Sequence, residues 1–390
     1  MSEFNTDQRH AIEHGAGPLI IIAGPGSGKT TVITNRISYL VNKLRVNPEN
    51  ILVLTFSRAA AAEMQARYEL LIKQKDAVTF GTIHSVFYHV LLKYYGSSAK
   101  DYIISEGIAG YHYDESVYGR DFIVDDVEGG VRFDEMLQLT YELLGAREDI
   151  CEALRKQYKW ILIDEFQDID ELQYKIVKMI AGRNPNLTIV GDDDQSIYGF
   201  RGARPDIMHG FTKDYPGAET IILRTNYRST KSIVRASKKL IRHNKRRFSK
   251  RLKSANERGT KVVIKEFNNT REEYMDIAAS IQGDSAVLFR TNMQNEYLTK
   301  AIEEYGRDPN TVTRMTFHAS KGLEFDTVYI IDANEGIAPH KNSRTKKAIE
   351  EERRMFYVAM TRARKNLFIY YVKHIRQRPC KKSRFIAELK

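Results

Sequence analysis

Short apolar runs rich in β-branched residues recur along the chain and alternate with segments of helical periodicity. Helical spacing is seen between many of them, for example at Ile33, Ile37, Leu40 and Val41. Buried strands that alternate with helices are typical of doubly wound parallel sheets, so the pattern predicts an α/β fold. The predicted strands cover residues 19–22, 51–54, 160–163, 187–190, 221–223, 262–264, 286–289, 328–331 and 367–371.

The number of predicted strands exceeds what one compact sheet usually holds, so we expect two α/β halves that divide near residue 222. The first half would comprise residues 1–93 and 155–222, and the second residues 223–390. Residues 94–154 would form a small, mostly helical insertion in the first half. This insertion is acidic, because residues 101–150 hold 13 acidic and three basic side chains.

The rest of the chain is strongly basic. The whole sequence carries a net charge of +11 and residues 101–150 carry −10, which leaves +21 for the remainder. Such a balance suits a polyanionic partner. A basic stretch at 238–253 is interrupted by Leu240, Ile241 and Phe248, which favours a solvated helix face with modest DNA attraction over a localisation signal.

Cysteine usage and hydropathy bear on the cellular compartment. Cys151 and Cys380 are the two cysteines, and they lie far apart in the sequence. Neither an apolar stretch of 18 residues nor a signal-like N-terminus is present. We therefore expect a protein of the reduced cytoplasm, nucleoid-associated if bacterial, with no membrane partner.

The segment LIIIAGPGSGKT at residues 19–30 predicts a phosphate-binding loop. Its apolar strand ends in a glycine-rich turn that delivers Lys29 and Thr30 to the start of a helix. Backbone N–H groups and the helix dipole can hold a β-phosphate, Lys29 can reach the β and γ oxygens, and Thr30 can bind Mg²⁺. Ala23 replaces the usual first glycine of this motif. The alternative interpretation, a glycine-rich turn that is followed by a lysine by chance, therefore stays open here. The expected nucleotide-binding residues are Ala23, Gly24, Gly26, Ser27, Gly28, Lys29, Thr30 and Thr31.

A second half of the site follows from WILIDEFQD at residues 160–168. Its apolar strand ends in Asp164 and Glu165, at the edge where open α/β sheets bind ligands. Asp164 would complete the Mg²⁺ shell, and Glu165 would accept a proton from the water that attacks the γ-phosphate. An acidic pair at a strand end is common by itself. Together with the lysine loop it predicts hydrolysis of a nucleoside triphosphate.

Eight further blocks narrow this prediction. They are FNTDQRHAI (4–12), TFSRAAAAEM (55–64), FGTIHS (80–85), VGDDDQSIYGFRGA (190–203), NYRS (226–229), FRTN (289–292), TFHASKGLEF (316–325) and EEERRMFYVAMTRA (350–363). Their content and order closely resemble the motif series of UvrD/PcrA/Rep-like superfamily 1A DNA helicases. The resemblance covers nearly the whole chain outside residues 94–154. It implies two RecA-like domains that hydrolyse ATP between them and move 3′→5′ on single-stranded DNA, including at junctions with duplex.

Further nucleotide contacts come partly from side-chain chemistry and partly from this resemblance. The amide of Gln8 can pair with adenine N6 and N7, although an isolated glutamine near a helix start is as often merely solvated. Arg228 and Arg362 could enter the ATP site from the second half as arginine fingers. The resemblance also implies a γ-phosphate or water contact for Gln195, adenine stacking for Tyr227, a place near the nucleotide for Arg36, and a ribose or bridging contact for Glu324.

The DNA track is predicted from aromatic residues beside polar ones. Phe56, Tyr198 and Phe200 could each stack on an unpaired base without reading sequence. At position 200 the family usually has the larger ring of tryptophan. The resemblance implies that the strand backbone is held by Thr55, Thr82, His84, Arg201, Arg290, Asn292, Thr316 and His318. No Cys/His spacing supports a zinc site at the histidines.

Two departures from the family affect strand separation. In the relatives, a large domain called 2B follows FRTN, whereas here only RDPNTV separates Gly306 from residues 313–316, so we expect 2B to be absent near 306–313. The relatives also carry a hairpin with an aromatic tip, but residues 373–385 hold no aromatic before Phe385. The sequence therefore predicts translocation along single-stranded DNA more securely than strand separation.

Alternatives to a helicase stay open. One is a translocase that strips proteins from single strands without unwinding duplex. Another is an ATP-gated single-strand-binding subunit of a repair or nuclease complex, recruited through residues 94–154. We expect the chain to act as a monomer.

Overall fold

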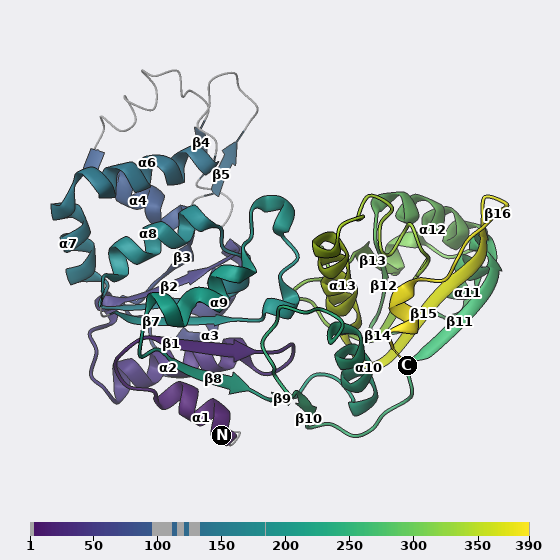
Figure 1. Ribbon diagram of the computed structural model, residues 1–390, viewed down its shortest axis with the longest axis horizontal. Helices are drawn as coiled ribbons and strands as arrows, with labels where there is room; N and C mark the ends of the chain where they lie inside the picture. The colour runs from purple at the N-terminus through teal and green to yellow at the C-terminus, as the bar shows by residue number, and fades with distance from the viewer. Residues whose placement is uncertain (1–3, 96–110, 115–120, 125–132, 184, 390) are drawn as a thin grey trace. The chain divides into compact units, whose positions relative to one another are not determined.

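The computed structural model describes residues 4–95, 111–114, 121–124, 133–183 and 185–389. The chain divides into two compact units. The first contains residues 1–21, 30–190 and 201–221, and the second contains residues 22–29, 191–200 and 222–390. Each unit combines helices with a mainly parallel sheet, which confirms the predicted α/β class (Figure 1).

The first sheet has the strand order β3-β2-β6-β7-β1-β8. Strands β1 and β2 are buried along their whole length, as expected for a parallel sheet covered on both faces. Its strands are β1 (Leu19–Ala23), β2 (Ile51–Thr55), β3 (Thr79–Thr82), β6 (Trp160–Ile163), β7 (Asn186–Gly191) and β8 (Glu219–Leu223). The registers given for β2 with β3, β2 with β6 and β6 with β7 are all parallel.

Helices connect these strands, and their ends follow local capping rules. Asn5 and Gln8 form a capping box at the start of α1, and Asp170 and Gln173 form another at the start of α8. The helices are α1 (Thr6–Glu13), α2 (Lys29–Asn42), α3 (Arg58–Ile72), α4 (Ile83–Tyr95), α8 (Glu171–Ala181) and α9 (Pro205–Asp214). Short 3₁₀ turns are η1 (Pro48–Asn50), η2 (Phe166–Asp168) and η4 (Gly199–Arg201).

The described residues of the expected insertion contain helices and a pair of short strands. Helices α6 (Phe133–Ala146) and α7 (Glu148–Gln157) pack against α8, and α6 also packs against α4. An antiparallel pair is formed by β4 (Tyr111–Asp114) and β5 (Asp121–Val124). Much of the acidic stretch, at 96–110, 115–120 and 125–132, lies outside the described residues.

The second sheet has the order β11-β15-β14-β12-β13, with β16 paired antiparallel to β15. Its five main strands run parallel to one another. They are β11 (Val263–Asn269), β12 (Ser285–Phe289), β13 (Thr313–Thr316), β14 (Phe325–Ile330) and β15 (Ala363–Ile375), and β16 is Arg378–Pro379. Two short parallel strands, β9 (Thr225–Asn226) and β10 (Lys253–Ser254), pair separately.

Alternate residues of β12 point to opposite faces of this sheet, and each face has its own core. Ala286 and Leu288 pack with α10 (Lys231–Ile241) and α13 (Lys346–Met360). Val287 and Phe289 pack with α11 (Thr270–Ser280) and α12 (Asn292–Glu304). The remaining short elements are η3 (Asp193–Gln195), η5 (Pro309–Thr311) and α14 (Arg384–Ala387).

The two regions where the sequence departs from the family are both short in the structure. Helix α12 is joined to β13 by residues 305–312, which include η5. Strands β15 and β16 are joined by a tight turn in which Arg376 and Gln377 have φ of 47° and 62°. Phe385 lies in the core with no exposed surface, so it offers no ring at this turn.

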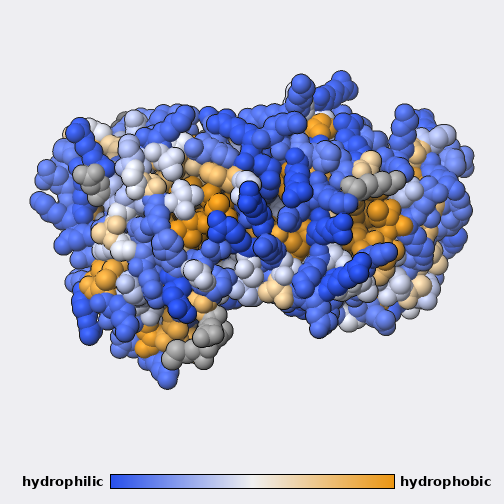
Figure 2. All heavy atoms as spheres, turned by 60° about the horizontal axis from the view of Figure 1, so that its bottom comes forward, coloured by the Kyte–Doolittle hydropathy of each residue, from blue (hydrophilic) through white to orange (hydrophobic). Residues whose placement is uncertain are grey.

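Hydrophilic residues predominate on the face drawn in Figure 2, with apolar residues in separate small patches. Within the described ranges, no helix is both long and apolar enough to cross a membrane.

Candidate nucleotide and nucleic-acid sites

The phosphate loop joins the buried end of β1 to the start of α2 at Lys29. Gly26 and Gly28 have φ of 66° and 84°, a left-handed conformation that glycine adopts without strain. The hydroxyl of Ser27 donates to the carbonyl of Gly24 at 2.8 Å and helps to fix the turn. The first N–H groups of a helix lack intrahelical acceptors, so this loop with Lys29 suits a bound phosphate.

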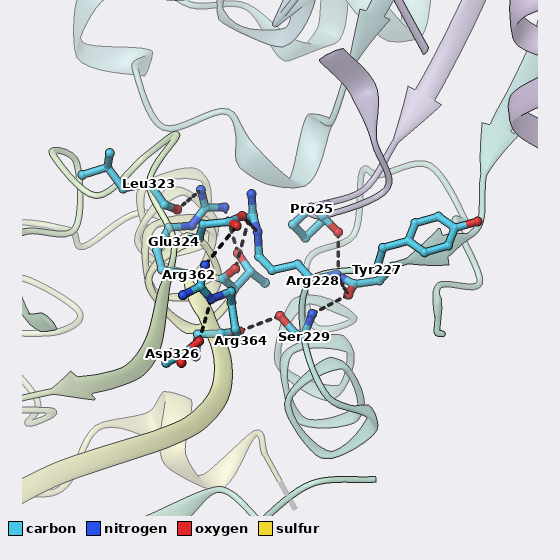
Figure 3. Close-up of polar contacts among 12 residues, drawn as sticks. Pro25, Tyr227, Arg228, Ser229, Leu323, Glu324, Asp326, Arg362 and Arg364 are labelled. Atoms are coloured by element: carbon cyan, nitrogen blue, oxygen red, sulfur yellow. Dashed lines mark hydrogen bonds and ion pairs between the residues drawn. The ribbon is translucent and has the colours of Figure 1, made fainter. Parts of the chain in front are cut away.

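The phosphate loop contacts the NYRS block directly within the second unit (Figure 3). Asn226 Nδ2 donates to the carbonyl of Pro25 at 2.6 Å, and the Tyr227 N–H donates to the carbonyl of Gly26 at 2.8 Å. A Cβ on Gly26 would lie 2.5 Å from the Cβ of Arg228. Glycine is therefore required here for close approach as well as for its backbone conformation. The sequence predicted both blocks as nucleotide-binding but gave no contact between them.

Arg228 is held by an acidic partner. Its Nε donates to Glu324 Oε2 at 2.5 Å, and its Nη1 donates to the carbonyl of Thr361 at 3.3 Å. Burial raises the pKa of Glu324, but the guanidinium groups of Arg228 and Arg364 outweigh it, so the pKa is lowered overall. Glu324, expected at the ribose or as a bridge, here orients Arg228. The half-exposed Tyr227 ring points away from this group in Figure 3.

Arg362 meets Gln195 in the interior of the second unit. Its Nη2 donates to Gln195 Oε1 at 3.1 Å, and both residues are buried. Nε and Nη1 of Arg362 donate to the carbonyls of Val358 and Leu323 at 3.0 and 3.2 Å. The other end of the Gln195 amide donates to Asp192 Oδ2 at 2.6 Å. Burial raises the pKa of Asp192, while Lys250 and Lys29 act in the opposite direction.

The acidic pair lies at the end of β6 in the first unit. Glu165 has φ 50° and ψ 38°, a left-handed conformation that is uncommon for a residue with a Cβ and is often found at functional sites. Asp164 Oδ1 accepts from the Glu165 N–H at 2.8 Å. Gln167 Nε2 donates to both Glu165 Oε2 and Asp168 Oδ2, which fixes the Glu165 carboxylate. Sequence reasoning missed Gln167 as the residue that orients Glu165.

The oxygen ligands expected for Mg²⁺ fit that ion chemically. Asp164 and Thr30 are both in the first unit and offer a carboxylate and a hydroxyl, the hard oxygen ligands that Mg²⁺ prefers. Asp164 is buried, and its backbone N–H donates to the carbonyl of Leu54, so its strand-end position is fixed.

Gln8 has a structural partner. Its side-chain oxygen accepts from the Asn5 N–H at 3.3 Å in the capping box of α1. Gln8 is buried, so it is not the solvated residue that the sequence left open, and its pairing with adenine stays a prediction.

Arg36, expected near the nucleotide, is engaged with backbone carbonyls in this structure. Arg36 has no exposed surface, and its guanidinium donates to the carbonyl of His14 at 2.6 Å and to Thr188 Oγ1 at 3.2 Å. Longer bonds reach the carbonyls of Ala11 and Ile12. Burial lowers the pKa of Arg36 to about 10. These donors fix the chain after α1, so Arg36 has a structural role, and its place near the nucleotide stays a prediction.

In the first unit, the DNA-binding candidates gather at the ends of two neighbouring strands. Thr55 and Thr82 are partners in the register of β2 and β3, so Phe56 and His84 follow adjacent strand ends. The Thr55 hydroxyl donates to the carbonyl of Ser57 at 2.9 Å. Thr82 exchanges hydrogen bonds with Ser85, and Phe56 keeps 36% of its surface exposed. Arg201 is exposed at the end of η4.

The second unit repeats this arrangement. Phe289 and Thr316 are partners in the register of β12 and β13, so Arg290, Asn292 and His318 follow adjacent strand ends. Asn292 is exposed at the first position of α12. Arg290 forms a two-point ion pair with Glu352, at 3.0 and 2.8 Å. The sequence gave no sign of this acidic partner.

Three of the candidate rings form one cluster. Phe200 and His318 meet edge to face with ring centroids 5.4 Å apart, and Tyr198 lies 6.1 Å from Phe200 and 6.4 Å from His318. Lys321 Nζ lies 4.9 Å from the centre of the Tyr198 ring. Phe200 is 67% exposed, so this cluster presents a ring to a passing base.

A phosphate loop, an acidic strand end and two parallel sheets define a P-loop nucleotide-binding protein of the two-domain α/β class. Residues 4–107 and 115–216 match the UvrD/REP helicase N-terminal domain, and residues 221–313 and 303–374 match the UvrD-like helicase C-terminal domain. The chain belongs to the UvrD/REP helicase family, as its motifs suggested.

Individual relatives support the same assignment. The chain is 35% identical over 350 residues to YjcD of Bacillus subtilis strain 168; the match covers 74% of this chain and 46% of YjcD. It is 32% identical over 362 residues to ATP-dependent DNA helicase PcrA of Staphylococcus epidermidis, covering 77% of this chain and 50% of PcrA. It is 30% identical over 384 residues to PcrA of Staphylococcus aureus strain Mu50, and the match covers 83% of this chain and 53% of that PcrA. The chain thus spans about half the length of these relatives.

Proposed function

We propose that this protein is an ATP-dependent motor that moves 3′→5′ along single-stranded DNA. The observation that carries the proposal is the hydrogen bond from Arg362 to Gln195. Arg362 is a cation that can stabilise a γ-phosphate. The hydrogen bond connects it to the segment that contains Gln195 and also carries the exposed ring of Phe200. Polarity and the preference for DNA rest on family membership.

The nucleotide half of the proposal assigns each group a role. The phosphate loop and Lys29 bind the phosphates, and Arg228 and Arg362 stabilise charge on the γ-phosphate. Glu165, oriented by Gln167, accepts a proton from the attacking water. Thr30 and Asp164 would hold Mg²⁺, which supplies neutralisation of phosphate charge.

The DNA half uses the strand-end residues of both sheets. Polar groups there would contact phosphates and sugars, while Phe56 and the cluster of Tyr198, Phe200 and His318 would stack on bases. None of these contacts reads sequence, so we propose a track without sequence preference. The cluster is adjacent in sequence to Gln195, which gives nucleotide state a short route to the stacking residues.

A translocase that does not separate strands is the second candidate. It is favoured by the turn between β15 and β16, where Arg376 and Gln377 stand in place of an aromatic tip. The short connection at residues 305–312 also provides no additional duplex-binding domain.

The test compares phosphate release with and without single-stranded DNA, using Lys29→Ala and Glu165→Gln. Both variants should lose turnover, and Glu165→Gln should still bind a fluorescent ATP analogue because its phosphate loop is intact. Lys43→Ala is a matched control, since Lys43 is exposed just beyond the C-terminus of α2. Wild-type turnover in Glu165→Gln would overturn the assigned base.

Movement is tested by streptavidin displacement from oligonucleotides biotinylated at either end. Faster displacement from the 5′ end supports 3′→5′ movement, and equal, ATP-independent rates at both ends would contradict it. A duplex with a 3′ tail then separates the two candidates, because only a helicase displaces the second strand.

A further inference from the structure

Lys250 lies at the centre of a buried cluster of charges in the second unit. Only 1% of its side chain is exposed, and its ammonium contacts the carboxylates of Asp192, Asp193 and Asp194. The distance from Lys250 Nζ to Asp194 Oδ2 is 2.6 Å. This placement differs from the solvated helix face expected for residues 238–253, because α10 ends at Ile241 and the following loop turns Lys250 inward.

The rest of the cluster is also paired. Arg247 donates to both oxygens of Asp194, at 2.8 and 2.6 Å. The Phe248 N–H donates to Asp193 Oδ2 at 2.8 Å. One carboxylate oxygen from each aspartate lies within 4.8 Å of the others, a spacing that could hold a cation. Lys250 and Arg247 already supply that positive charge, so the cluster is an ion-pair network.

Asp192 connects Lys250 to the nucleotide site. Its Oδ1 contacts Lys250, and its Oδ2 accepts from Gln195 Nε2 at 2.6 Å. An amide has one donor end and one acceptor end, so a carboxylate at Nε2 directs Oε1 the opposite way. That oxygen accepts from Arg362 Nη2. Lys250, Asp192, Gln195 and Arg362 thus form one continuous chain of contacts.

We propose that Lys250 is a positioning residue for ATP hydrolysis, acting through Asp192 to fix the orientation of the Gln195 amide and, with it, the Arg362 guanidinium. The proposal rests on the function proposed above. A buried carboxylate that loses its cation tends to rotate or to take up a proton. Rotation would take the acceptor away from Gln195 Nε2, and protonation would weaken that hydrogen bond because the acceptor loses its charge. The effect should fall mainly on the rate of turnover, because Lys250 contacts neither the phosphate loop nor the adenine-binding candidates in the contacts described, although Asp192 also interacts electrostatically with Lys29.

The first experiment measures DNA-stimulated phosphate release by Lys250→Met, which keeps the length of the side chain and removes its charge. Misplacement of catalytic groups by about 1 Å can cost 10²-fold, so kcat should fall by about 10- to 100-fold. KM for ATP should change by less than about threefold, which separates turnover from binding. Lys245→Met is the matched control, because Lys245 is exposed in the same loop and should keep wild-type kcat at saturating DNA.

A second variant distinguishes positioning from charge balance. Lys250→Met leaves three carboxylates against Arg247, and Lys250→Met/Asp193→Asn restores the original net charge of the cluster. Asp193 contacts Lys250 and the Phe248 N–H, and no contact with Gln195 is among those described. Positioning through Asp192 predicts that the double variant folds and stays slow. Recovery of wild-type kcat would show that Lys250 only balances charge and would overturn the proposal.

A double-mutant cycle with Gln195→Ala tests whether Lys250 acts through Gln195. A purely structural role of Lys250 would not make its effect depend on Gln195. If Lys250 acts through Gln195, adding Lys250→Met/Asp193→Asn to Gln195→Ala should slow turnover by less than about twofold more. Multiplying effects would contradict the proposal.

Measurements on the wild-type enzyme distinguish a failure of the proposed function from a failure of the role proposed for Lys250. A wild-type chain with no DNA-stimulated ATPase would contradict the proposed function. An active wild type together with wild-type kcat in Lys250→Met would overturn the role of Lys250 alone.

Discussion

Gly26 and Arg228 approach so closely that a Cβ on Gly26 would lie 2.5 Å from the Cβ of Arg228 and 3.2 Å from its backbone nitrogen. Real Cβ atoms essentially never come that close to a neighbour, and backbone cannot move aside as a flexible side chain can. The phosphate loop and the NYRS block are therefore matched in shape at one position as well as linked by hydrogen bonds.

Gly26→Ala should reduce ATP turnover by about tenfold or more, since small displacements of catalytic groups are costly. The new Cβ meets Arg228, and φ of 66° adds about 1–2 kcal/mol of strain for a non-glycine residue. Steady-state phosphate release measures the loss. Gly15→Ala is the control, because an added Cβ there meets no atom within 4 Å and φ is not positive. Equal rates in the two variants would refute the steric argument.

Phe200→Ala should weaken binding to single-stranded DNA by about 1–3 kcal/mol, or roughly 5- to 150-fold. The ring is mostly exposed and lies beside His318, so its loss removes a stacking surface without opening the core. Fluorescence anisotropy with a labelled oligothymidine measures the affinity, and ATPase without DNA should stay unchanged. Tyr305→Ala removes another half-exposed ring and should bind DNA normally. Normal affinity in Phe200→Ala would argue against stacking there.

Arg36→Met should lower the free energy of unfolding by at least about 1–3 kcal/mol, the cost of leaving a buried polar group without its partner. The carbonyl of His14 would lose its 2.6 Å donor. Urea denaturation measures the change, with exposed Arg9→Met as the control. The folded fraction should bind nucleotide with wild-type affinity. Loss of affinity without loss of stability would show that Arg36 acts at the nucleotide site and not in the fold.

Glu273→Gln should make stability less dependent on pH. Burial and the neighbouring Asp332 raise the pKa of Glu273 well above 4.5, so the folded state retains a proton that the unfolded state releases. This contribution is complete below about pH 4.5 and is lost as pH rises toward the folded pKa, by up to about 1.4 kcal/mol per pH unit.

Urea denaturation between pH 5 and pH 8 checks this prediction. The amide needs no proton, so Glu273→Gln should gain stability over the wild type as pH increases. Glu303→Gln, at an exposed position of α12, should follow the wild-type slope. A Glu273→Gln slope equal to that of the wild type would mean that Glu273 is ionised when buried.

Hydrophobic pattern was sufficient to predict the buried strands of both sheets but missed two edge strands. Strand β3 reads TFGT and β13 reads TRMT, and neither contains an apolar run. Each lies at the edge of its sheet, where one side lacks a neighbour and the need for apolar side chains is weaker. Their existence depends on pairing with β2 and β12, which no local pattern reports.

Local motifs predicted the phosphate loop and the acidic pair because those residues act through their immediate neighbours in sequence. Lys250 and Glu352 have partners far away in the sequence, and neither the basic stretch at 238–253 nor the motif block at 350–363 indicates those partners. Arg36 has structural partners that its sequence position did not indicate. The family resemblance placed it near the nucleotide, and its burial and the carbonyls around it add a role in the fold.

The short connection at residues 305–312 also affects how the second unit assembles. Strands β12 and β13 are separated only by α12 and this connection, so their register from Ala286 with Thr313 to Phe289 with Thr316 closes a small loop. Small loops cost little entropy and form quickly. The β12 and β13 segments can therefore meet during synthesis with no separately folding domain between them, before β14 is made and covers the other side of β12.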